Sequence, residues 1–468
     1  MMDDILAGLG AIVGERHLMT EPTAMEPYLR EWRHLFIGKA RAVVKPKTAG
    51  EVSAILKLAH ETGTPIVPQG GNTGLVGGQI PIAEGREIVL SLTRLDQVRS
   101  VDPDSDVMVV EAGVTLARAQ EAAEGAGRLF PLSLASEGSC TIGGNLSTNA
   151  GGTAVLAYGN ARDLCLGLEV VLADGQIWRG LGSLRKDNTG YDLKNLFIGA
   201  EGTLGIITAA SLKLFAKPQA RATAFASVPD PEAALALFKL ARAEAGGPLT
   251  TFEIMPRFGL EIVLRHAADA RAPLAEASPW SVLMELSTPS LNGLNGVMEA
   301  LLEKALDTGL ITDAAIAASG AQRKALWRIR EAMSEVQTLE GGSIKHDVSV
   351  PVSRVPELLA RGAALIERLI PGARPLPFGH LGDGNIHFNI SQPLSADKAA
   401  FLARWDEANE AVHGLVSELG GSISAEHGIG RLKRHLLPGV KDPAGLAMMR
   451  AIKATLDPKG ILNPGAVL

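Results

Sequence analysis

Cysteine is scarce in this chain of 468 residues, and its scarcity excludes two kinds of site. Only Cys140 and Cys165 are present. Two thiols can build neither a disulfide framework nor an iron–sulfur cluster held by four thiolates. This cysteine usage fits a reducing cytoplasm, which is the location we expect.

Clusters of positive charge and long apolar runs are also missing. The formal net charge is −6 and there are no basic runs, whereas nucleic-acid binding needs Lys and Arg gathered on one face. The opening stretch MMDDILAGLGAIVG begins with acidic residues instead of the basic region of an export signal. No apolar run approaches the roughly 18 residues of a membrane span. We therefore expect no nucleic-acid partner and no membrane span, and a small molecule as the ligand.

Two common nucleotide-binding motifs are absent as well. A Walker A loop needs a Lys that the glycine loops of this chain lack, and no strand leads through G-x-G-x-x-G into a helix. The nearest approach is Gly8, Gly10 and Gly14, which lie in a helix-like segment with no strand before it. An NAD site is not expected.

What is present is an ordinary globular composition in three blocks. The chain is 46% hydrophobic and 21% charged, and its length indicates two or three domains. Short strands alternate with amphipathic helices up to residue 218, two strand pairs with helices between them follow, and the last block is mostly helical. We expect an α+β protein with domains at 36–218 and 219–394 and a helical C-terminal segment at 395–468. The helices of the middle block should cover one face of its sheet.

Glycine is concentrated in loops beside the predicted strands of the first block. QGGNTGLVGGQ follows a strand that ends at Pro68, and EGSCTIGGNLSTNAGG and FIGAEGTLGIIT come later. Successive backbone N–H groups without Cβ atoms can turn towards one anion and hold a pyrophosphate without lysine. A mobile surface loop is the alternative for the first stretch alone, but small polar residues in the second stretch are typical of a cofactor lining.

These loops resemble the FAD-binding domain of the vanillyl-alcohol oxidase type (PCMH-type), and within it the branch of D-2-hydroxyglutarate and D-lactate dehydrogenases. The resemblance runs over nearly the whole chain and implies FAD, with a substrate or cap domain after it. Members that tether FAD covalently carry a His where this chain has Asn72, so non-covalent FAD is expected. The implied FAD contacts are Pro68, Gly70, Gly71, Asn72, Thr73, Gly74, Gly138, Ser139, Gly143, Gly144, Asn145, Thr148, Asn149, Gly202 and Ile207.

A second motif, PFGHLGDGNIHFNI, contains two histidines seven residues apart. On one straight strand their rings would point to opposite faces. A turn at residues 382–384 would instead let His380 end one strand and His387 begin the next, so that both rings can reach one atom. His387 and Asn389 would then share a face.

Farther on, SISAEHGIG adds Glu426 and His427. Two His and one carboxylate form a site for Zn²⁺, Mn²⁺ or Fe²⁺ with open positions for substrate. The alternative, that each His is only hydrogen-bonded at a domain junction, explains one motif better than both together. The resembling dehydrogenases use the matching residues as a metal site; we assign His380, His387 and Glu426 as ligands, with zinc the first choice, and His427 as the base.

A third motif, LWRIREAMSEVQTLEGGSIKHDVSVP, places Arg330 and Ser334 four residues apart on a predicted helix and Lys345 on a following strand. Two cations and a hydroxyl could converge on one carboxylate, although an isolated Arg on such a helix is usually solvated. The segment resembles the region that binds the distal carboxylate in D-2-hydroxyglutarate dehydrogenases, where a Thr stands in place of Ser334. Asn389 is the further residue expected at the substrate and in catalysis.

The expected reaction is oxidation of D-2-hydroxyglutarate to 2-oxoglutarate by hydride transfer to FAD, assisted by the metal. The acceptor of the electrons should be an electron-transfer flavoprotein or a quinone. Alternatives are a D-lactate or D-malate-like acid as substrate, a flavin-free metallohydrolase, or a non-catalytic oxidase subunit. A homodimer is compatible with the sequence.

Overall fold

The structure is a computed structural model that describes residues 2–82, 84–290 and 293–468, without the side chains of residues 2–4. It divides into two compact units. Unit 1 comprises Met1–Gly152, Gly159–Lys217 and Glu426–Leu468, and unit 2 comprises Thr153–Tyr158 and Pro218–Ala425. No helix within the described ranges has the length and apolar character needed to cross a membrane.

The first sheet of unit 1 has the strand order β1-β2-β4-β3, with β2, β4 and β3 parallel. Its strands are β1 (Leu18–Met19), β2 (Ala42–Val44), β3 (Ile66–Gln69) and β4 (Ile88–Ser91). Helix α3 (Ala49–Thr62) joins β2 to β3. It begins where the Thr48 side chain caps its first turn, and it ends at Gly63, whose φ is 66°. Helices α1 (Met2–Val13) and α2 (Pro22–Leu29) precede the parallel strands. Strand β3 therefore delivers the first glycine loop at its carboxyl end.

The second sheet of unit 1 is antiparallel, with the order β5-β6-β10-β8-β9. Its strands are β5 (Val98–Asp102), β6 (Val107–Glu111), β8 (Cys165–Val171), β9 (Ile177–Gly180) and β10 (Ile206–Lys213). The other elements of this part are α4 (Leu116–Gly125), β7 (Arg128–Leu129), α5 (Ile142–Thr148), α7 (Lys194–Phe197) and β11 (Phe215–Ala216). Helix α5 carries the second glycine loop; its first turn is capped by the Thr141 side chain, and Asn149 ends it in the left-handed region.

The C-terminal part of unit 1 consists of α15 (Leu437–Val440) and α16 (Pro443–Leu456). The Lys453 ammonium on α16 donates to the carbonyl oxygen of Thr203, at 2.7 Å, and to that of Leu462, at 2.9 Å. Leu462 also forms an isolated parallel β-bridge with Ile66 of β3. The end of the chain thus returns to the strand and loops that begin the unit.

Unit 2 is built on one antiparallel sheet with the order β15-β12-β14-β13-β18-β19-β16, and β17 also pairs with β19. The strands are β12 (Ala220–Val228), β13 (Leu249–Pro256), β14 (Trp280–Thr288), β15 (Asp313–Ile316), β16 (Ser343–Ile344), β17 (Asp347–Ser349), β18 (Arg374–His380) and β19 (Asn385–Ser391). The helices are α6 (Val155–Tyr158), α8 (Pro231–Ala245), α9 (Arg257–His266), α10 (Leu294–Asp307), α11 (Gly320–Val336), α12 (Val355–Leu369), α13 (Lys398–Leu402) and α14 (Trp405–Glu418).

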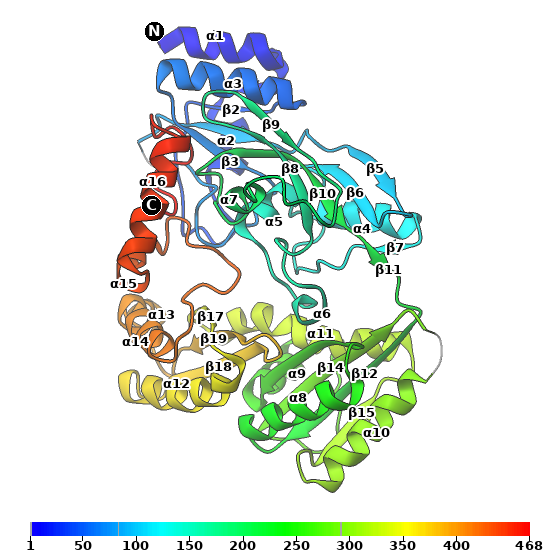
Figure 1. Cartoon of the computed structure of the whole chain (residues 1–468). Helices are drawn as coiled ribbons and strands as arrows, with labels where there is room; N and C mark the ends of the chain where they lie inside the picture. Colours follow the sequence, from blue (N-terminus) through cyan, green and yellow to red (C-terminus); the bar gives the residue numbers. More distant parts are fainter. Residues whose placement is uncertain (1, 83, 291–292) are drawn as a thin grey trace. The chain divides into compact units, whose positions relative to one another are not determined.

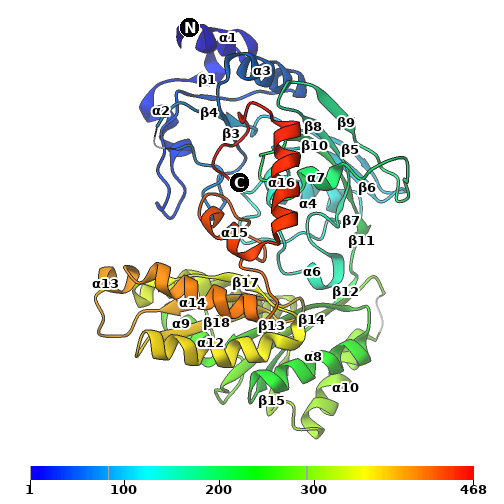
Figure 2. The ribbon, with the colours of Figure 1, turned by 60° about the vertical axis from the view of Figure 1, so that its left-hand side comes forward.

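Helices cover both faces of this sheet, so the expectation of one covered face is wrong. Figure 1 shows α8 and α12 side by side on one face, and Figure 2 shows α14 running beside α12. Alternate residues of the central strands enter two separate cores: Met284 packs in the core under α8, α10 and α12, whereas Leu283 packs in the core under α9 and α11. Helix α9 was not predicted from the sequence, and with α11 it forms the second layer.

The segment boundaries also differ from those expected. Residues 395–425, assigned to the C-terminal segment, belong to unit 2, where Phe401 and Val412 are buried in its core. Residues 153–158, expected in the first domain, belong to unit 2 as well. Hydrophobic periodicity locates these helices, but it does not indicate which sheet they cover.

Candidate active site

Two of the glycine loops touch in unit 1. A Cβ on Gly70 would collide with the Thr141 hydroxyl, and one on Gly71 would collide with the carbonyl oxygen of Ser139. Glycine is therefore required where the loop after β3 meets the turn before α5.

The third loop joins the same cluster. Gly202 has φ 71°, and a Cβ there would collide with the Pro68 ring. Beside it, the buried Glu201 carboxylate accepts hydrogen bonds from the backbone N–H of Ile429, at 2.8 Å, and of Gly430, at 2.9 Å. Burial raises the pKa of Glu201, and those two backbone donors and Lys433 oppose the rise. One carboxylate thus ties the third loop to the segment that follows His427.

The first two glycine loops contain an unpaired buried acceptor and backbone without Cβ atoms. The Asn72 side chain donates to the carbonyl oxygens of Pro27, at 3.0 Å, and Arg30, at 2.9 Å, while its own Oδ1 is buried and has no hydrogen-bond partner among the described residues. Around the position of a Cβ on Gly138 there is open space to 4 Å in the described part of the chain. An orphaned buried acceptor and Cβ-free backbone next to space fit a bound cofactor.

The other predicted FAD contacts lie around this cluster. Gly143, Gly144 and Thr148 are on α5, Ile207 is buried on β10, and the buried Asn145 donates to the Cys140 sulfur at 3.6 Å. Thr73 and Gly74 continue the first loop, Ser139 precedes α5 and Asn149 ends it. All of the predicted FAD residues are in unit 1.

In unit 2 the two predicted metal histidines form the hairpin that the sequence indicates. His380 is the last residue of β18, the Gly384 N–H donates back to its carbonyl oxygen at 3.0 Å, and His387 is the third residue of β19. The imidazole centroids are 5.8 Å apart, and ligand nitrogens of the two rings lie within 4.8 Å of each other. Both rings can therefore reach one ion.

Strand register explains which residues share the face of these histidines. His380 is opposite Glu253 on β13 and Asn385 on β19, and His387 is opposite Asp347 on β17. Residues opposite each other point to the same side of a sheet. Ile386, Phe388 and Ile390 point to the other side, where they are buried in the core under α12. The alternation of β19 thus separates a polar row from the core.

Two carboxylates support the histidines on this face. Glu253, which is fully buried, places Oε1 2.5 Å from His380 Nδ1 and Oε2 2.6 Å from Arg330 Nε. Burial alone would raise the pKa of Glu253, but Arg330 and His380 hold it down at about 2. Because Glu253 engages Nδ1, His380 would bind a metal through Nε2, and carboxylates commonly orient histidine ligands in this way.

Asp347 is the second carboxylate. Its Oδ1 accepts from the Asn385 amide at 2.9 Å and lies 3.9 Å from His387 Nδ1. The backbone N–H of Ala425 is 3.4 Å from the carbonyl oxygen of Asp347. The chain therefore reaches the strand that flanks His387 one residue before Glu426.

The predicted ligand and base on the C-terminal side lie in unit 1. Glu426 and His427 open the last segment of that unit, and the Glu426 carboxylate accepts from the backbone N–H of Gly152 at 2.9 Å. The structure thus places Glu426 beside the end of the second glycine stretch. The expectation that Glu426 joins the two histidines remains a prediction.

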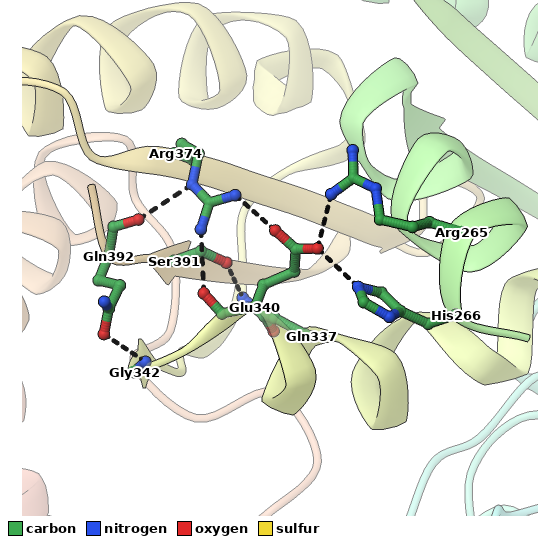
Figure 3. A network of polar contacts seen from close by, with 8 residues as sticks. All are labelled: Arg265, His266, Gln337, Glu340, Gly342, Arg374, Ser391 and Gln392. Atoms are coloured by element: carbon green, nitrogen blue, oxygen red, sulfur yellow. Dashed lines mark hydrogen bonds and ion pairs between the residues drawn. The ribbon is translucent and has the colours of Figure 1, made fainter. Parts of the chain in front are cut away.

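A chain of buried amides continues the polar row. Asn389 donates to Gln337 Oε1 at 2.9 Å, and Gln337 donates to the Ser391 hydroxyl at 2.9 Å. Figure 3 shows that Gln337 lies on the same short turn as Glu340, whose carboxylate accepts from Arg265, His266 and Arg374 at 2.6–2.7 Å. Burial would raise the pKa of Glu340, but the hydrogen bonds from His266, Arg374 and Arg265 lower it to about 2.

The predicted carboxylate-binding residues are only partly arranged as expected. Arg330 and Ser334 are on α11, but Arg330 is buried against Glu253 whereas Ser334 is exposed. Lys345 is not on a strand: it lies in the break between β16 and β17, where its ammonium donates to the carbonyl oxygen of Ser334 at 3.1 Å. A two-residue interruption of a strand does not change the alternation of the sequence, so the expectation that Lys345 lies on a strand was wrong.

Glu253, Asp347 and Gln337 were not predicted. Glu253 sits in TTFEI, where an acidic residue between Phe252 and Ile254 is a signal that could have been noticed, because buried carboxylates are almost always paired. Asp347 and Gln337 carry no comparable signal.

Comparison with known proteins agrees with this architecture. The family described as "FAD linked oxidases, C-terminal domain" matches residues 217–467, and the family described as "FAD binding domain" matches residues 40–180. Among solved structures, p-cresol methylhydroxylase with substrate bound is similar over 99% of this chain and 96% of its own, with a TM-score of 0.77 and 17% identity. That likeness supports a PCMH-type fold.

Relatives of known name cover the chain from end to end. The mitochondrial D-2-hydroxyglutarate dehydrogenase of Bos taurus is 41% identical over 100% of this chain and 84% of its own length. The D-2-hydroxyglutarate dehydrogenase of Xanthomonas citri pv. viticola is 36% identical over 99% and 97%. A putative mitochondrial D-lactate dehydrogenase of Schizosaccharomyces pombe is also 36% identical, over 97% and 87%. The chain therefore belongs to the FAD-linked oxidase family, in the group that contains the D-2-hydroxyglutarate dehydrogenases.

Proposed function

We propose that this protein oxidises a D-2-hydroxy diacid, D-2-hydroxyglutarate in the first place, to the 2-oxo acid. The observation that carries the proposal is the polar face of unit 2. On it His380 lies next to the buried carboxylate of Glu253, and His387 lies next to that of Asp347. Arg330 contacts the other oxygen of Glu253. A pair of oriented imidazoles beside a guanidinium suits a substrate with two carboxylates.

Two groups would complete this site. FAD would supply a two-electron acceptor, and a divalent metal, zinc first, would supply a Lewis acid for the C1 carboxylate and C2 hydroxyl. We propose His380, His387 and Glu426 as the metal ligands. The histidines fit, because one is held through Nδ1 by Glu253 and the other lies beside Asp347. Glu426 fits because the preceding residue is hydrogen-bonded to Asp347.

The remaining roles belong to the chain's own side chains. We propose that His427 removes the hydroxyl proton and that Asn389 binds the substrate, with its amide held by Gln337. Arg330, Ser334 and Lys345 would bind the distal carboxylate. Since Cys140 and Cys165 cannot hold a cluster, an electron-transfer flavoprotein or a quinone would take the electrons.

A D-lactate or D-malate-like substrate is the second candidate. The ion pair between Arg330 and Glu253 favours it, because a guanidinium already matched with a carboxylate has less charge to offer to a substrate. Under this alternative Arg330 would stabilise the fold through its ion pair, and the substrate would be bound through a single carboxylate at the metal.

The deciding experiment is anaerobic reduction of the flavin in purified protein of measured FAD and metal content. D-2-Hydroxyglutarate should bleach the flavin, its L-enantiomer should not, and D-lactate should need a much higher concentration. Protein that holds both FAD and metal but is bleached by none of the D-2-hydroxy acids would refute the proposed function.

A further inference from the structure

One carboxylate joins two residues of the proposed site that have separate tasks. Glu253 is fully buried on β13, and its oxygens contact His380 Nδ1 at 2.5 Å and Arg330 Nε at 2.6 Å. His380 is the proposed metal ligand and Arg330 the proposed ligand of the distal carboxylate. The two residues come from different elements, β18 and α11, and Glu253 is bonded to both.

This arrangement fixes the distance between imidazole and guanidinium. The two oxygens of a carboxylate are rigidly spaced, and each takes one of the two donors. Arg330 is also held over the Phe378 ring, with its Cζ 4.8 Å from the ring centroid, and Phe378 is opposite His387 in register. The guanidinium therefore has an anion at one edge and a ring at one face, and little freedom to move along the substrate.

We propose that Glu253 is a positioning residue that determines the length of the diacid. It would do so by setting the separation between the metal-binding edge of His380 and the terminal nitrogens of Arg330. This inference rests on the proposed function, in which one carboxylate of the substrate lies at the metal and the other at Arg330.

Unit 2 offers a matched control on the neighbouring strand. Glu285 on β14 is also buried and also faces α11, where it accepts from Trp327 Nε1 at 3.0 Å and pairs with Arg323 at 3.5 Å. Its other side-chain partners are Thr223 and Arg221, both on β12. Glu285→Gln therefore tests what removing a buried anion beneath α11 does by itself.

Glu253→Gln should disturb both neighbours of the carboxylate. In the amide an NH₂ donor replaces one of the two carboxylate oxygens, so the side chain no longer offers a separate acceptor atom to each of His380 and Arg330. If its NH₂ faces His380, the proton moves to Nε2 and blocks the metal; if it faces Arg330, two donors meet. The loss of the negative charge also makes His380 a weaker ligand.

The test uses acids without a 2-hydroxyl, so that no turnover occurs. Binding of glutarate and succinate to protein loaded with FAD and zinc is measured by calorimetry, and zinc affinity is measured by competition with a chelator. Wild-type protein should prefer glutarate by at least about tenfold, because the shorter succinate loses one charge-assisted hydrogen bond. In Glu253→Gln this preference should fall to near unity and zinc affinity should fall about 10- to 100-fold. Glu285→Gln should change neither value.

Glu253→Asp keeps the experiment decisive if Glu253→Gln does not fold. It retains the charge but is one methylene shorter, so it cannot span both donors, and the glutarate preference should again fall. If either folded variant keeps the wild-type glutarate preference, or if Glu253→Gln lowers only one of the two values, the shared role of Glu253 is overturned. Failure of the proposed function would look different: wild-type protein would then bind no zinc, or would bind neither glutarate nor succinate.

Discussion

The side-chain amide of Asn389 donates a hydrogen bond to Gln337 at 2.9 Å, and both side chains are almost completely buried. Gln337 in turn donates to Ser391, so its own amide cannot rotate without losing one of these bonds. Asn389 is thereby fixed with its Nδ2 towards Gln337. Its remaining oxygen has a defined direction, as a group that binds substrate requires.

Gln337→Leu should lower kcat for the D-2-hydroxy acid by about tenfold or more, because Asn389 loses the bond that orients it and a buried donor is left unpaired at a cost of about 1–3 kcal/mol. Metal content should not change. Steady-state kinetics and metal analysis of the folded variant measure both effects. Thr338→Ala is the control, since Thr338 is on the same turn but exposed. Equal losses in the two variants would remove the orienting role.

The flavin should be released completely by acid precipitation. Asn72 stands where a tethering His would be, and its amide is bonded to Pro27 and Arg30. Cys140 is buried, and burial raises the pKa of the Cys165 thiol to about 12, so neither thiol is poised to form a thioether. Absorbance of the supernatant measures the release. Yellow colour that stays in the pellet would contradict a non-covalent cofactor.

Metal binding and flavin binding should respond to different substitutions. His380→Ala or His387→Ala should abolish turnover and metal retention but leave FAD bound, because the glycine loops are in the other unit. Glu426→Gln should behave like the two histidine variants, whereas His427→Ala should keep the metal and lose the rate of flavin reduction. Elemental analysis and flavin absorbance check these outcomes. Full activity of metal-stripped protein would exclude the metal from the reaction.

The contribution of Glu340 to the free energy of unfolding should be lost at low pH. Its pKa in the folded chain is about 2, below the ordinary value of about 4.5, so its ion pairs stabilise the fold above pH 4.5 and this contribution is lost as the pH falls towards 2. Chemical unfolding should therefore show Glu340→Gln less stable than wild type at pH 7, with the difference narrowing between pH 4.5 and pH 3. Glu335→Gln, an exposed carboxylate on α11, is the control. A constant difference across this range would show that packing, not charge, is responsible.

The sequence predicts the parts of the site that depend on local pattern. The hairpin between His380 and His387 follows from the glycines of its turn, and the helix at Pro231–Ala245 follows from periodicity. In each case the necessary information lies within about 15 residues.

What could not be predicted depends on pairing between distant segments. Glu253 meets His380 across 127 residues of sequence, because β13 pairs with β18 in one particular register. A shift of that register by one residue would turn Glu253 to the opposite face. The burial of Arg330 depends on the same pairing, because the sequence of α11 does not indicate that the Glu253 carboxylate lies beneath this helix.

The most direct test of the account is substrate preference in wild type and Arg330→Ala, measured as kcat/KM for D-2-hydroxyglutarate and D-lactate. If Arg330 binds the distal carboxylate, wild type should favour the diacid by roughly ten- to a hundredfold, from about 1.5–3 kcal/mol per charge-assisted bond. Arg330→Ala should lose most of that preference while D-lactate turnover changes far less, and Arg323→Ala, on the same helix but paired with Glu285, should keep it. A wild type that prefers D-lactate, or an Arg330→Ala variant that loses both substrates equally, would contradict diacid recognition at this site.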